Sequence, residues 1–189
     1  MNIREQALKR PTERMSNMGF RLMSLTFDLI DLVHPYIDRR VTTFGIREGM
    51  TVVDYGCGPG RYTTRFAKLV GDRGRVYAVD IHELAIEGVK DKIARLDLRN
   101  VQPMLAQGYD CGLPDHVAEV VCALDMFFGI KQPTEFLAEL KRITRPDGVL
   151  VIDDGHQPRE VTKEKILASG LWIIQEETPD HLKCKPRDG

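Results

Sequence analysis

The sequence predicts an α/β protein whose core is a largely parallel β-sheet covered by helices on both faces. From residue 51 onward, short apolar runs alternate with amphipathic stretches that have helical spacing. Runs that are apolar at successive positions are typical of strands buried on both faces, as in parallel sheets. The last two strand-like runs are separated only by a tight turn at Pro179-Asp180, which predicts antiparallel pairing at one edge.

The N-terminal part of the chain has a different pattern from the rest. Residues 1–17 are polar with a net positive charge, and we expect them to form a mobile or loosely helical arm. Apolar side chains then recur at helical spacing over 18–33, and Pro35 ends that helix. We therefore expect an N-terminal arm and helical cap over residues 1–45 and a main α/β unit over 46–189, within one structural domain.

Strands and helices are expected to alternate along the main unit. Seven strands are expected over Thr51–Tyr55, Arg75–Asp80, Val101–Ala106, Glu119–Leu124, Gly148–Asp153, Leu171–Glu177 and His181–Lys185. The other expected helices are Tyr36–Phe44, Arg61–Val70, Glu83–Leu96, Pro133–Thr144 and Arg159–Ser169. Strands joined through helices form a doubly wound, mostly parallel sheet, here with an antiparallel edge strand.

Composition and charge exclude several classes of protein. The 189 residues include 27 Lys and Arg against 28 Asp and Glu, so the basic excess of a general nucleic-acid binder is absent. No apolar run approaches the ~20 residues of a membrane span, and the first residues contain no apolar secretory segment. The cysteines form no CxxC pair and no cluster with zinc spacing, so we expect no metal site and a reduced, cytoplasmic setting.

The most informative segment is the glycine-rich run 54–60 (DYGCGPG), which follows the first strand and opens a helix. Open parallel sheets bind ligands at this edge, and a helix start supplies free N–H groups. Glycines there permit positive φ angles and let a ligand approach the backbone. Dinucleotide loops require G-x-G-x-x-G, whereas these glycines fall at 56, 58 and 60 and position 61 is Arg. An NAD(P)-dependent oxidoreductase is therefore an alternative that the spacing disfavours.

The run 54–60 resembles the first motif of class I S-adenosylmethionine-dependent methyltransferases, and the resemblance extends over most of 46–185. Asp80 ends the second strand, 20 residues beyond Gly60, and the fifth strand follows the turn 145–148 (RPDG), both in the expected order. The resemblance implies a Rossmann-like sheet and S-adenosyl-L-methionine as the cofactor. The small-molecule, quinone-biosynthesis-type branch is the most similar group.

The resemblance also assigns contacts to individual residues. Asp80 would accept hydrogen bonds from the ribose hydroxyls, Ile81 would pack on the adenine face, and Asp110 would receive the adenine amino group. Asp54 would hold the methionine amine or, alternatively, bond the loop's own backbone. The expected cofactor-binding residues are Asp54, Gly56, Cys57, Gly58, Gly60, Asp80, Ile81, Tyr109, Asp110 and Leu124.

Methyl transfer from a sulfonium is an in-line displacement, which depends mainly on alignment and on exclusion of water. A base is needed only when the acceptor carries a proton at the working pH. The candidate catalytic residues are His156, which follows the fifth strand, and Asp125, which follows the fourth. Histidine titrates near neutrality and suits proton removal, although a loop histidine without a catalytic task is the commoner case.

The acceptor is expected to be a small molecule. No insertion follows the fourth or fifth strand, so the acceptor pocket should come from 1–45 and 126–131. We expect the helix at 18–33 to cap the cofactor cleft, and its apolar breadth also fits an apolar substrate. A peripheral membrane contact, a homodimer surface and ordinary packing of this helix remain alternatives. The chain is expected to be a monomer or homodimer, and a non-catalytic cofactor-binding module is the remaining functional alternative.

Overall fold

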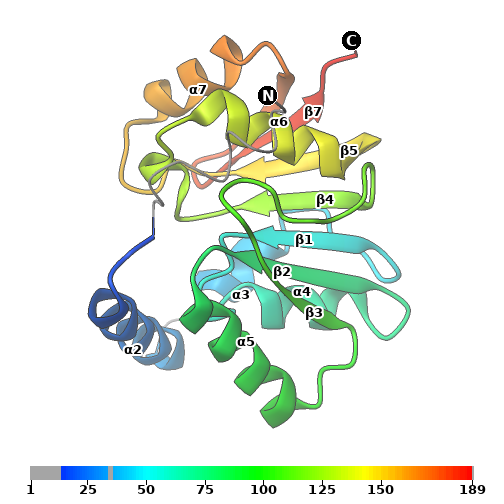
Figure 1. Ribbon diagram of the computed structural model, residues 1–189. Helices are drawn as coiled ribbons and strands as arrows, with labels where there is room; N and C mark the ends of the chain where they lie inside the picture. Colours follow the sequence, from blue (N-terminus) through cyan, green and yellow to red (C-terminus); the bar gives the residue numbers. More distant parts are fainter. Residues whose placement is uncertain (1–13, 34–35, 189) are drawn as a thin grey trace. The chain divides into compact units, whose positions relative to one another are not determined.

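The computed structural model describes residues 14–33 and 36–188, and in the first helix it describes side chains as far as Thr26. The predicted basic arm therefore lies, up to residue 13, outside the described residues. Two compact units divide this part of the chain, one ending at Leu105 and the other beginning at Ala106 (Figure 1). The helices of the predicted N-terminal cap belong to the first unit.

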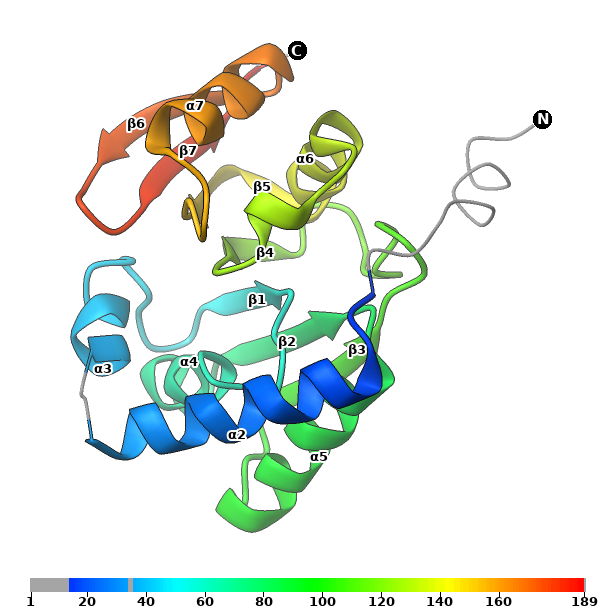
Figure 2. The same cartoon turned by 90° about the vertical axis from the view of Figure 1, so that its left-hand side faces the viewer.

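The unit 14–105 contains a three-stranded parallel sheet in the order β3-β2-β1. Its strands are β1 (Thr51–Tyr55), β2 (Arg75–Asp80) and β3 (Val101–Leu105). Its helices are α2 (Asn17–Val33), α3 (Tyr36–Val41), α4 (Thr63–Val70) and α5 (Glu83–Leu96). Figure 2 shows α2 along its length, passing α4 and α5. Pro103 lies within β3, which is an edge strand, and an edge strand tolerates a missing backbone N–H.

The unit 106–188 contains a four-stranded sheet in the order β4-β5-β7-β6. Its strands are β4 (Ala118–Ala123), β5 (Thr144–Ile152), β6 (Trp172–Glu177) and β7 (Leu182–Pro186). Its helices are η1 (Phe127–Gly129), α6 (Pro133–Ile143) and α7 (Arg159–Ala168). The pair β4 and β5 is parallel, and β7 is antiparallel to both β5 and β6. The predicted antiparallel end is therefore present, with β7 inserted between β5 and β6.

Side chains from strands and helices form the core of each unit. In the unit 14–105, Val53, Ala78 and Phe66 are fully buried, which fits strands that are apolar on both faces. In the unit 106–188, Trp172 is fully buried and its indole N–H donates to the carbonyl of Leu137 at 3.1 Å. The buried indole is therefore satisfied by the backbone of α6.

All seven predicted strands are present; β4 starts one residue earlier than predicted, at Ala118, and β5 starts four residues earlier. The sequence treats 145–148 as a turn, but β5 already begins at Thr144. Ala118 lies opposite Thr144 while Val120 lies opposite Val149, so residues 145–148 bulge from the ladder. A Cβ at Gly148 would lie 3.0 Å from the carbonyl oxygen of Glu119, so the bulge requires glycine there. Within the described residues, none of the helices combines the length and apolar character needed to cross a bilayer.

Candidate active site

The loop between β1 and α4 is pinned to the end of β2. Its three glycines have positive φ angles, 79° at Gly56, 50° at Gly58 and 82° at Gly60, where a side chain would strain the backbone. The N–H groups of Gly56 and Cys57 both donate to the carbonyl of Val79, at 2.8 and 3.0 Å. The glycine spacing read from the sequence therefore corresponds to three left-handed positions in one loop.

Two of these glycines are required for different reasons. A Cβ built on Gly60 would lie 3.1 Å from Cγ2 of Val89 on α5, so Gly60 allows the loop to pack against that helix. A Cβ built on Gly58 would meet no protein atom within 4 Å. The space that a Cβ would occupy at Gly58 is therefore open, and a cofactor could approach the backbone closely there.

Asp80, at the end of β2, fastens the same loop. Its Oδ2 accepts a hydrogen bond from the N–H of Gly58 at 2.9 Å, and its Oδ1 accepts one from the N–H of His82 at 2.8 Å. Burial raises the pKa of this carboxyl, and the two backbone hydrogen bonds oppose that effect. Since a carboxylate can accept about four hydrogen bonds in all, Asp80 retains capacity for the hydroxyls of a ribose.

Asp54, at the other end of the loop, has a structural contact. It is 2% exposed, and its Oδ2 accepts a hydrogen bond from Oγ1 of Thr63 at 2.5 Å. The bond ties β1 to the first residue of α4. The partner is a side chain of α4, so both predicted roles of Asp54, contact with a methionine amine and bonding of the loop's own backbone, stay predictions.

Cys57, at the centre of the loop, is a packing residue. Its side chain is 5% exposed and lies in one cluster with Ala78 and Val89. Burial, followed by the nearby carboxylates of Asp80 and Asp54, raises the pKa of its thiol well above the ordinary value. The thiol is therefore protonated at neutral pH, and the predicted cofactor contact of Cys57 falls to its backbone.

His82 joins the end of β2 to both α5 and α2. Its Nδ1 accepts from the N–H of Leu84 and caps α5, so the ring proton lies on Nε2, 3.1 Å from the carbonyl oxygen of Met15. The ring of Phe20 stacks on His82, with centroids 4.5 Å apart. The cap helix thus contacts the chain two residues beyond Asp80. Sequence reasoning misses this role, although a polar residue just before a predicted helix is the usual signal of an N-cap.

In the unit 106–188, Tyr109 and Asp110 lie in a short turn after β3. The backbone groups of Gln107 and Asp110 bond each other, at 2.9 and 3.2 Å. Oδ1 of Asp110 accepts from the N–H of Gly112 at 2.8 Å, and the hydroxyl of Tyr109 accepts from the N–H of Gln132 at 3.2 Å. The Tyr109 hydroxyl therefore anchors the start of α6, and the adenine contact expected of Asp110 stays a prediction.

Helix α6 also holds the segment that follows this turn. Oε1 of Glu139 accepts from the backbone N–H and the thiol of Cys111, at 3.1 and 3.0 Å. Arg142 donates to both carboxylate oxygens of Glu139 at 2.7 Å, to the carbonyl of Leu113 at 2.7 Å and to Asp115 at 2.6 Å. Burial and the hydrogen bond to Glu139 raise the pKa of the Cys111 thiol to about 12. Neither spacing nor composition in the sequence predicts this network.

Leu124 and Asp125 directly follow β4, which ends at Ala123, and both were predicted to lie at the site. Leu124 is buried at 4% exposure, whereas Asp125 is exposed. Asp125 has a φ of 57°, and its N–H donates to Oδ1 of Asp153 at 2.8 Å. Asp153 thus holds Asp125 in an uncommon backbone conformation of the kind that often occurs at functional sites.

His156, the other candidate base, is exposed and packs edge-on against the ring of Phe128, with centroids 4.8 Å apart. Gly155 makes this approach possible, since a Cβ there would lie 2.3 Å from Cδ1 of Phe128. The carboxylate of Asp154 accepts from Nε of Arg159 on both oxygens, at 2.9 and 2.7 Å. Phe128, rather than the neighbouring Asp154, is therefore the contact seen at the His156 ring.

The predicted site residues separate into two groups, and each group lies within one unit. The unit 14–105 contains Asp54, Gly56, Cys57, Gly58, Gly60, Asp80 and Ile81. The unit 106–188 contains Tyr109, Asp110, Leu124, Asp125 and His156. In the first group, hydrogen bonds bring the glycine loop and Asp80 together as one cradle.

Comparisons with known proteins identify the family of the chain. A family model described as a methyltransferase domain matches residues 46–185. A ubiquinone/menaquinone biosynthesis C-methyltransferase from Teredinibacter turnerae is 31% identical over 64% of this chain and 49% of its own length. A demethylmenaquinone methyltransferase from Staphylococcus aureus is 29% identical over 64% of this chain and 49% of its own. The chain thus spans about half the length of these curated relatives.

Solved structures share the fold. A SAM-dependent methyltransferase from Aquifex aeolicus superposes with a TM-score of 0.73 at 24% identity, covering 91% of this chain and 97% of the other. A coclaurine N-methyltransferase bound to N-methylheliamine and SAH superposes with a TM-score of 0.56 at 24% identity, covering 62% of this chain and 34% of the other. Because the family model covers most of its residues, the chain belongs to the methyltransferase domain family, with the Rossmann-like fold that its sequence predicts.

Proposed function

We propose that this protein is an S-adenosyl-L-methionine-dependent methyltransferase that acts on a small acceptor. The observation that carries the proposal is the cradle at the ends of β1 and β2. Its backbone is open at Gly58, and a half-buried carboxylate, Asp80, is bonded to that same residue. Membership of the methyltransferase domain family supports the assignment.

In this proposal the cradle holds the nucleoside part of the cofactor. Gly58 lets the cofactor approach the loop backbone, Asp80 accepts hydrogen bonds from the ribose hydroxyls, and Ile81 packs on the adenine. When bound, S-adenosyl-L-methionine supplies a methyl group made electrophilic by the sulfonium. The contact of α2 with His82 supports a role for that helix in closing over the cradle.

Residues of the other unit are proposed to serve the adenine and the acceptor. Asp110 receives the adenine amino group, and Leu124 supplies an apolar wall. Asp125 and His156 are proposed as proton acceptors for an acceptor that is protonated at the working pH. The exposure of Asp125 and the fixed position of its backbone support this role for Asp125, and the ring contact with Phe128 supports a defined position for His156.

The proposed acceptor is a small, apolar molecule, and the protein is proposed to act in the cytoplasm without nucleic acid. The curated relatives carry quinone-biosynthesis names, which supports an aromatic acceptor ring. The exposed side chain of Phe128 beside His156 offers a surface on which such a ring can pack.

Transfer of a labelled methyl group tests the proposal. Protein incubated with methyl-labelled cofactor and a panel of phenols and hydroquinones should release labelled product with at least one of them. A nicotinamide cofactor titrated in parallel should show no binding, because the third glycine of a dinucleotide loop is displaced. Cofactor binding without labelled product on any acceptor would favour the non-catalytic module instead, and binding of the nicotinamide cofactor alone would favour the oxidoreductase.

A further inference from the structure

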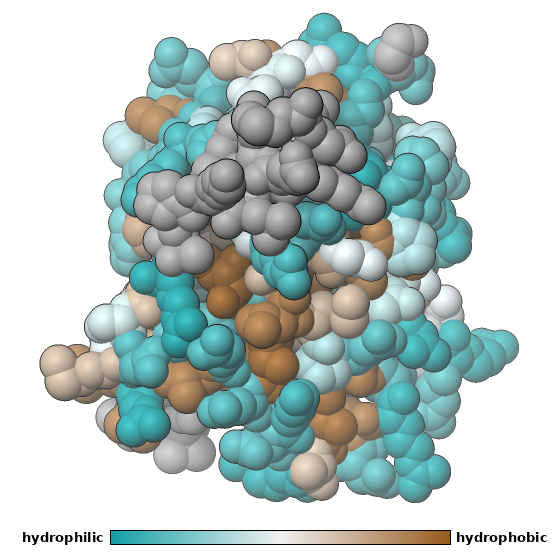
Figure 3. Space-filling model, in the orientation of Figure 1, coloured by the Kyte–Doolittle hydropathy of each residue, from teal (hydrophilic) through white to brown (hydrophobic). Residues whose placement is uncertain are grey.

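Phe128 and His156 lie in the segments that follow β4 and β5, and both are exposed. Most of the surface seen in Figure 3 is hydrophilic, whereas Phe128 leaves 40% of its area open to solvent. The two rings meet edge-on, with 4.8 Å between their centroids and 73° between their planes. Aromatic rings favour this arrangement, so the contact restricts the orientation of the His156 imidazole.

The contact between the rings requires glycine at position 155. Gly155 has a φ of 56°, and a Cβ built on it would lie 2.3 Å from Cδ1 and 3.0 Å from Cε1 of Phe128. A side chain at Gly155 would therefore occupy the place of the Phe128 ring. The glycine lets that ring lie against the backbone of the segment that carries His156.

The turn 154–157 is held to α7 at both of its ends. The N–H of Gln157 donates to the carbonyl of Asp154 at 3.2 Å and closes the turn. The Asp154 carboxylate accepts from Nε of Arg159 at 2.9 and 2.7 Å, and Oε1 of Gln157 accepts from Nζ of Lys165 at 2.7 Å. The backbone on each side of residue 156 is therefore anchored, although the histidine itself is exposed.

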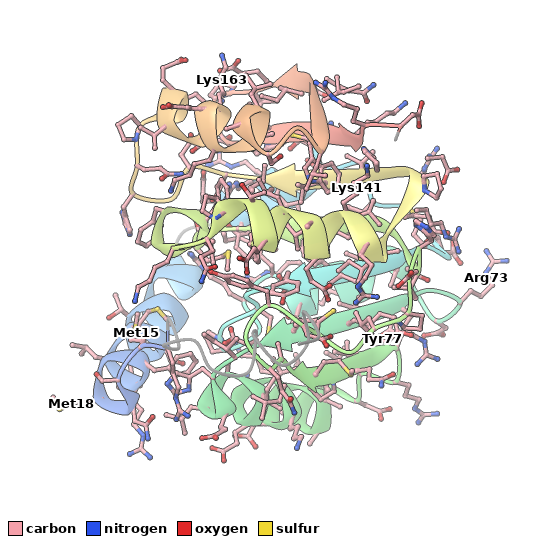
Figure 4. All side chains as sticks on the ribbon, turned by 45° about the horizontal axis from the view of Figure 1, so that its top comes forward. Met15, Met18, Arg73, Tyr77, Lys141 and Lys163 are labelled. Carbon is pink, nitrogen blue, oxygen red and sulfur yellow. The ribbon has the colours of Figure 1, made fainter. Side chains whose placement is uncertain are left out.

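The elements behind the two rings are also fixed in the unit 106–188. Helix α7 buries Ile166 completely, and its Lys163, labelled in Figure 4, donates to Glu177 of β6 at 3.0 Å. In η1, Phe127 is fully buried and stacks on Phe136 of α6, with centroids 6.0 Å apart. The exposed ring pair thus lies between two segments that the core of one unit holds in place.

We propose that Phe128 is a positioning residue, which orients the imidazole of His156 to remove a proton from the methyl acceptor. The inference rests on the proposed function and assigns one further residue to it. In this step the imidazole takes the proton, and the electron pair left on the acceptor forms the bond to the methyl carbon. The bond from that carbon to sulfur breaks, and sulfur keeps its electron pair. A base already held in position needs less ordering in the transition state.

Proton NMR tests the ring contact without any turnover. The ring C–H resonances of His156, identified by their loss in His156→Gln, should be displaced by the ring current of Phe128. Phe128→Leu should abolish the displacement and Phe128→Tyr should keep it. Gly155→Ala retains both rings but fills the space between them, so it should also abolish the displacement. Undisplaced resonances in the wild-type protein would overturn the inference.

Kinetics with an acceptor that the wild-type protein methylates test the consequence for catalysis. Phe128→Leu should lower kcat roughly tenfold or more while calorimetry shows unchanged cofactor affinity, and Phe128→Tyr should restore kcat. Adding Phe128→Leu to His156→Gln should lower kcat no further, because a positioning residue acts only through the ring that it positions. Leu167→Ala, which changes another exposed apolar side chain of this unit, is the control and should keep the wild-type kcat.

The outcomes separate this inference from the proposed function. Wild-type kcat with a raised KM in Phe128→Leu, or a further loss of kcat in the double variant, would overturn the inference and leave the methyltransferase assignment standing. Absence of labelled product from the wild-type protein with every acceptor would refute the proposed function, and the role in proton removal with it.

Discussion

Replacement of Gly58 by Ala should separate cofactor binding from folding. Gly58 has a φ of 50°, where an L-residue costs about 1–2 kcal/mol. A Cβ at this position would meet no protein atom within 4 Å, so we expect unfolding free energy to fall by no more than that amount. The same Cβ would stand where the cofactor is proposed to approach the loop. A methyl group forced into a fitted contact costs about 1–3 kcal/mol, which weakens binding roughly 5- to 150-fold.

Gly60→Ala is the matched variant. The φ angle of Gly60 is 82°, so an alanine there has a similar backbone cost. Its Cβ would lie 3.1 Å from Val89, so the loop or the Val89 side chain must shift. Urea unfolding should show the larger loss of stability in Gly60→Ala, and calorimetric titration with S-adenosylhomocysteine should show the larger loss of affinity in Gly58→Ala. Wild-type affinity in a folded Gly58→Ala protein would refute the placement of the cofactor on this loop.

Further predictions concern single side chains at or near the site. Asp80→Ala should weaken cofactor binding by about 1.5–3 kcal/mol. Burial raises the Asp80 pKa, and the ribose hydroxyls bind the ionised carboxylate, so the affinity of the wild-type protein for the cofactor should fall as pH is lowered through that raised pKa. Titrations at several pH values should show no such dependence in the variant. The Cys111 thiol, with its pKa raised to about 12, should react with a disulfide reagent at pH 8 only after unfolding; rapid labelling of the folded protein would contradict its burial against Glu139. Arg142→Lys should lower the unfolding free energy by ~1–2 kcal/mol, because a lysine cannot reproduce the forked hydrogen bonds, whereas Arg99→Lys at an exposed pair should change it by less than ~0.5 kcal/mol. If His156 removes a proton from the methyl acceptor, His156→Ala should reduce kcat about 100-fold or more. An unchanged kcat with a raised KM would contradict that role and would show that His156 only packs beside Phe128.

The strands could be predicted from the sequence because their signal is local. The apolar run of β1 and the end of β2 at Asp80 follow from the pattern alone, and their bounds agree with the prediction. The early start of β5 could not be predicted, since the need for Gly148 arises from the backbone of β4, which is distant in sequence. Helix α4 begins at Thr63 rather than Arg61, because the turn that pins the glycine loop continues through the first residues of the predicted helix.

The candidate site was predictable in its backbone and less so in its side-chain contacts. Glycine spacing predicts left-handed positions, and the φ angle of Gly58 agrees. A sequence does not show which N–H a carboxylate will meet, so the bond between Asp80 and Gly58 could not be foreseen. The capping role of His82 and the bonds from Arg142 to Glu139 join elements through geometry that spacing does not encode.

Calorimetric titration of the full chain with S-adenosyl-L-methionine, and with its demethylated product, tests the central claim most directly. Our account predicts saturable binding of one molecule per chain for each ligand. Absence of binding by protein whose circular dichroism confirms that it is folded would contradict the account.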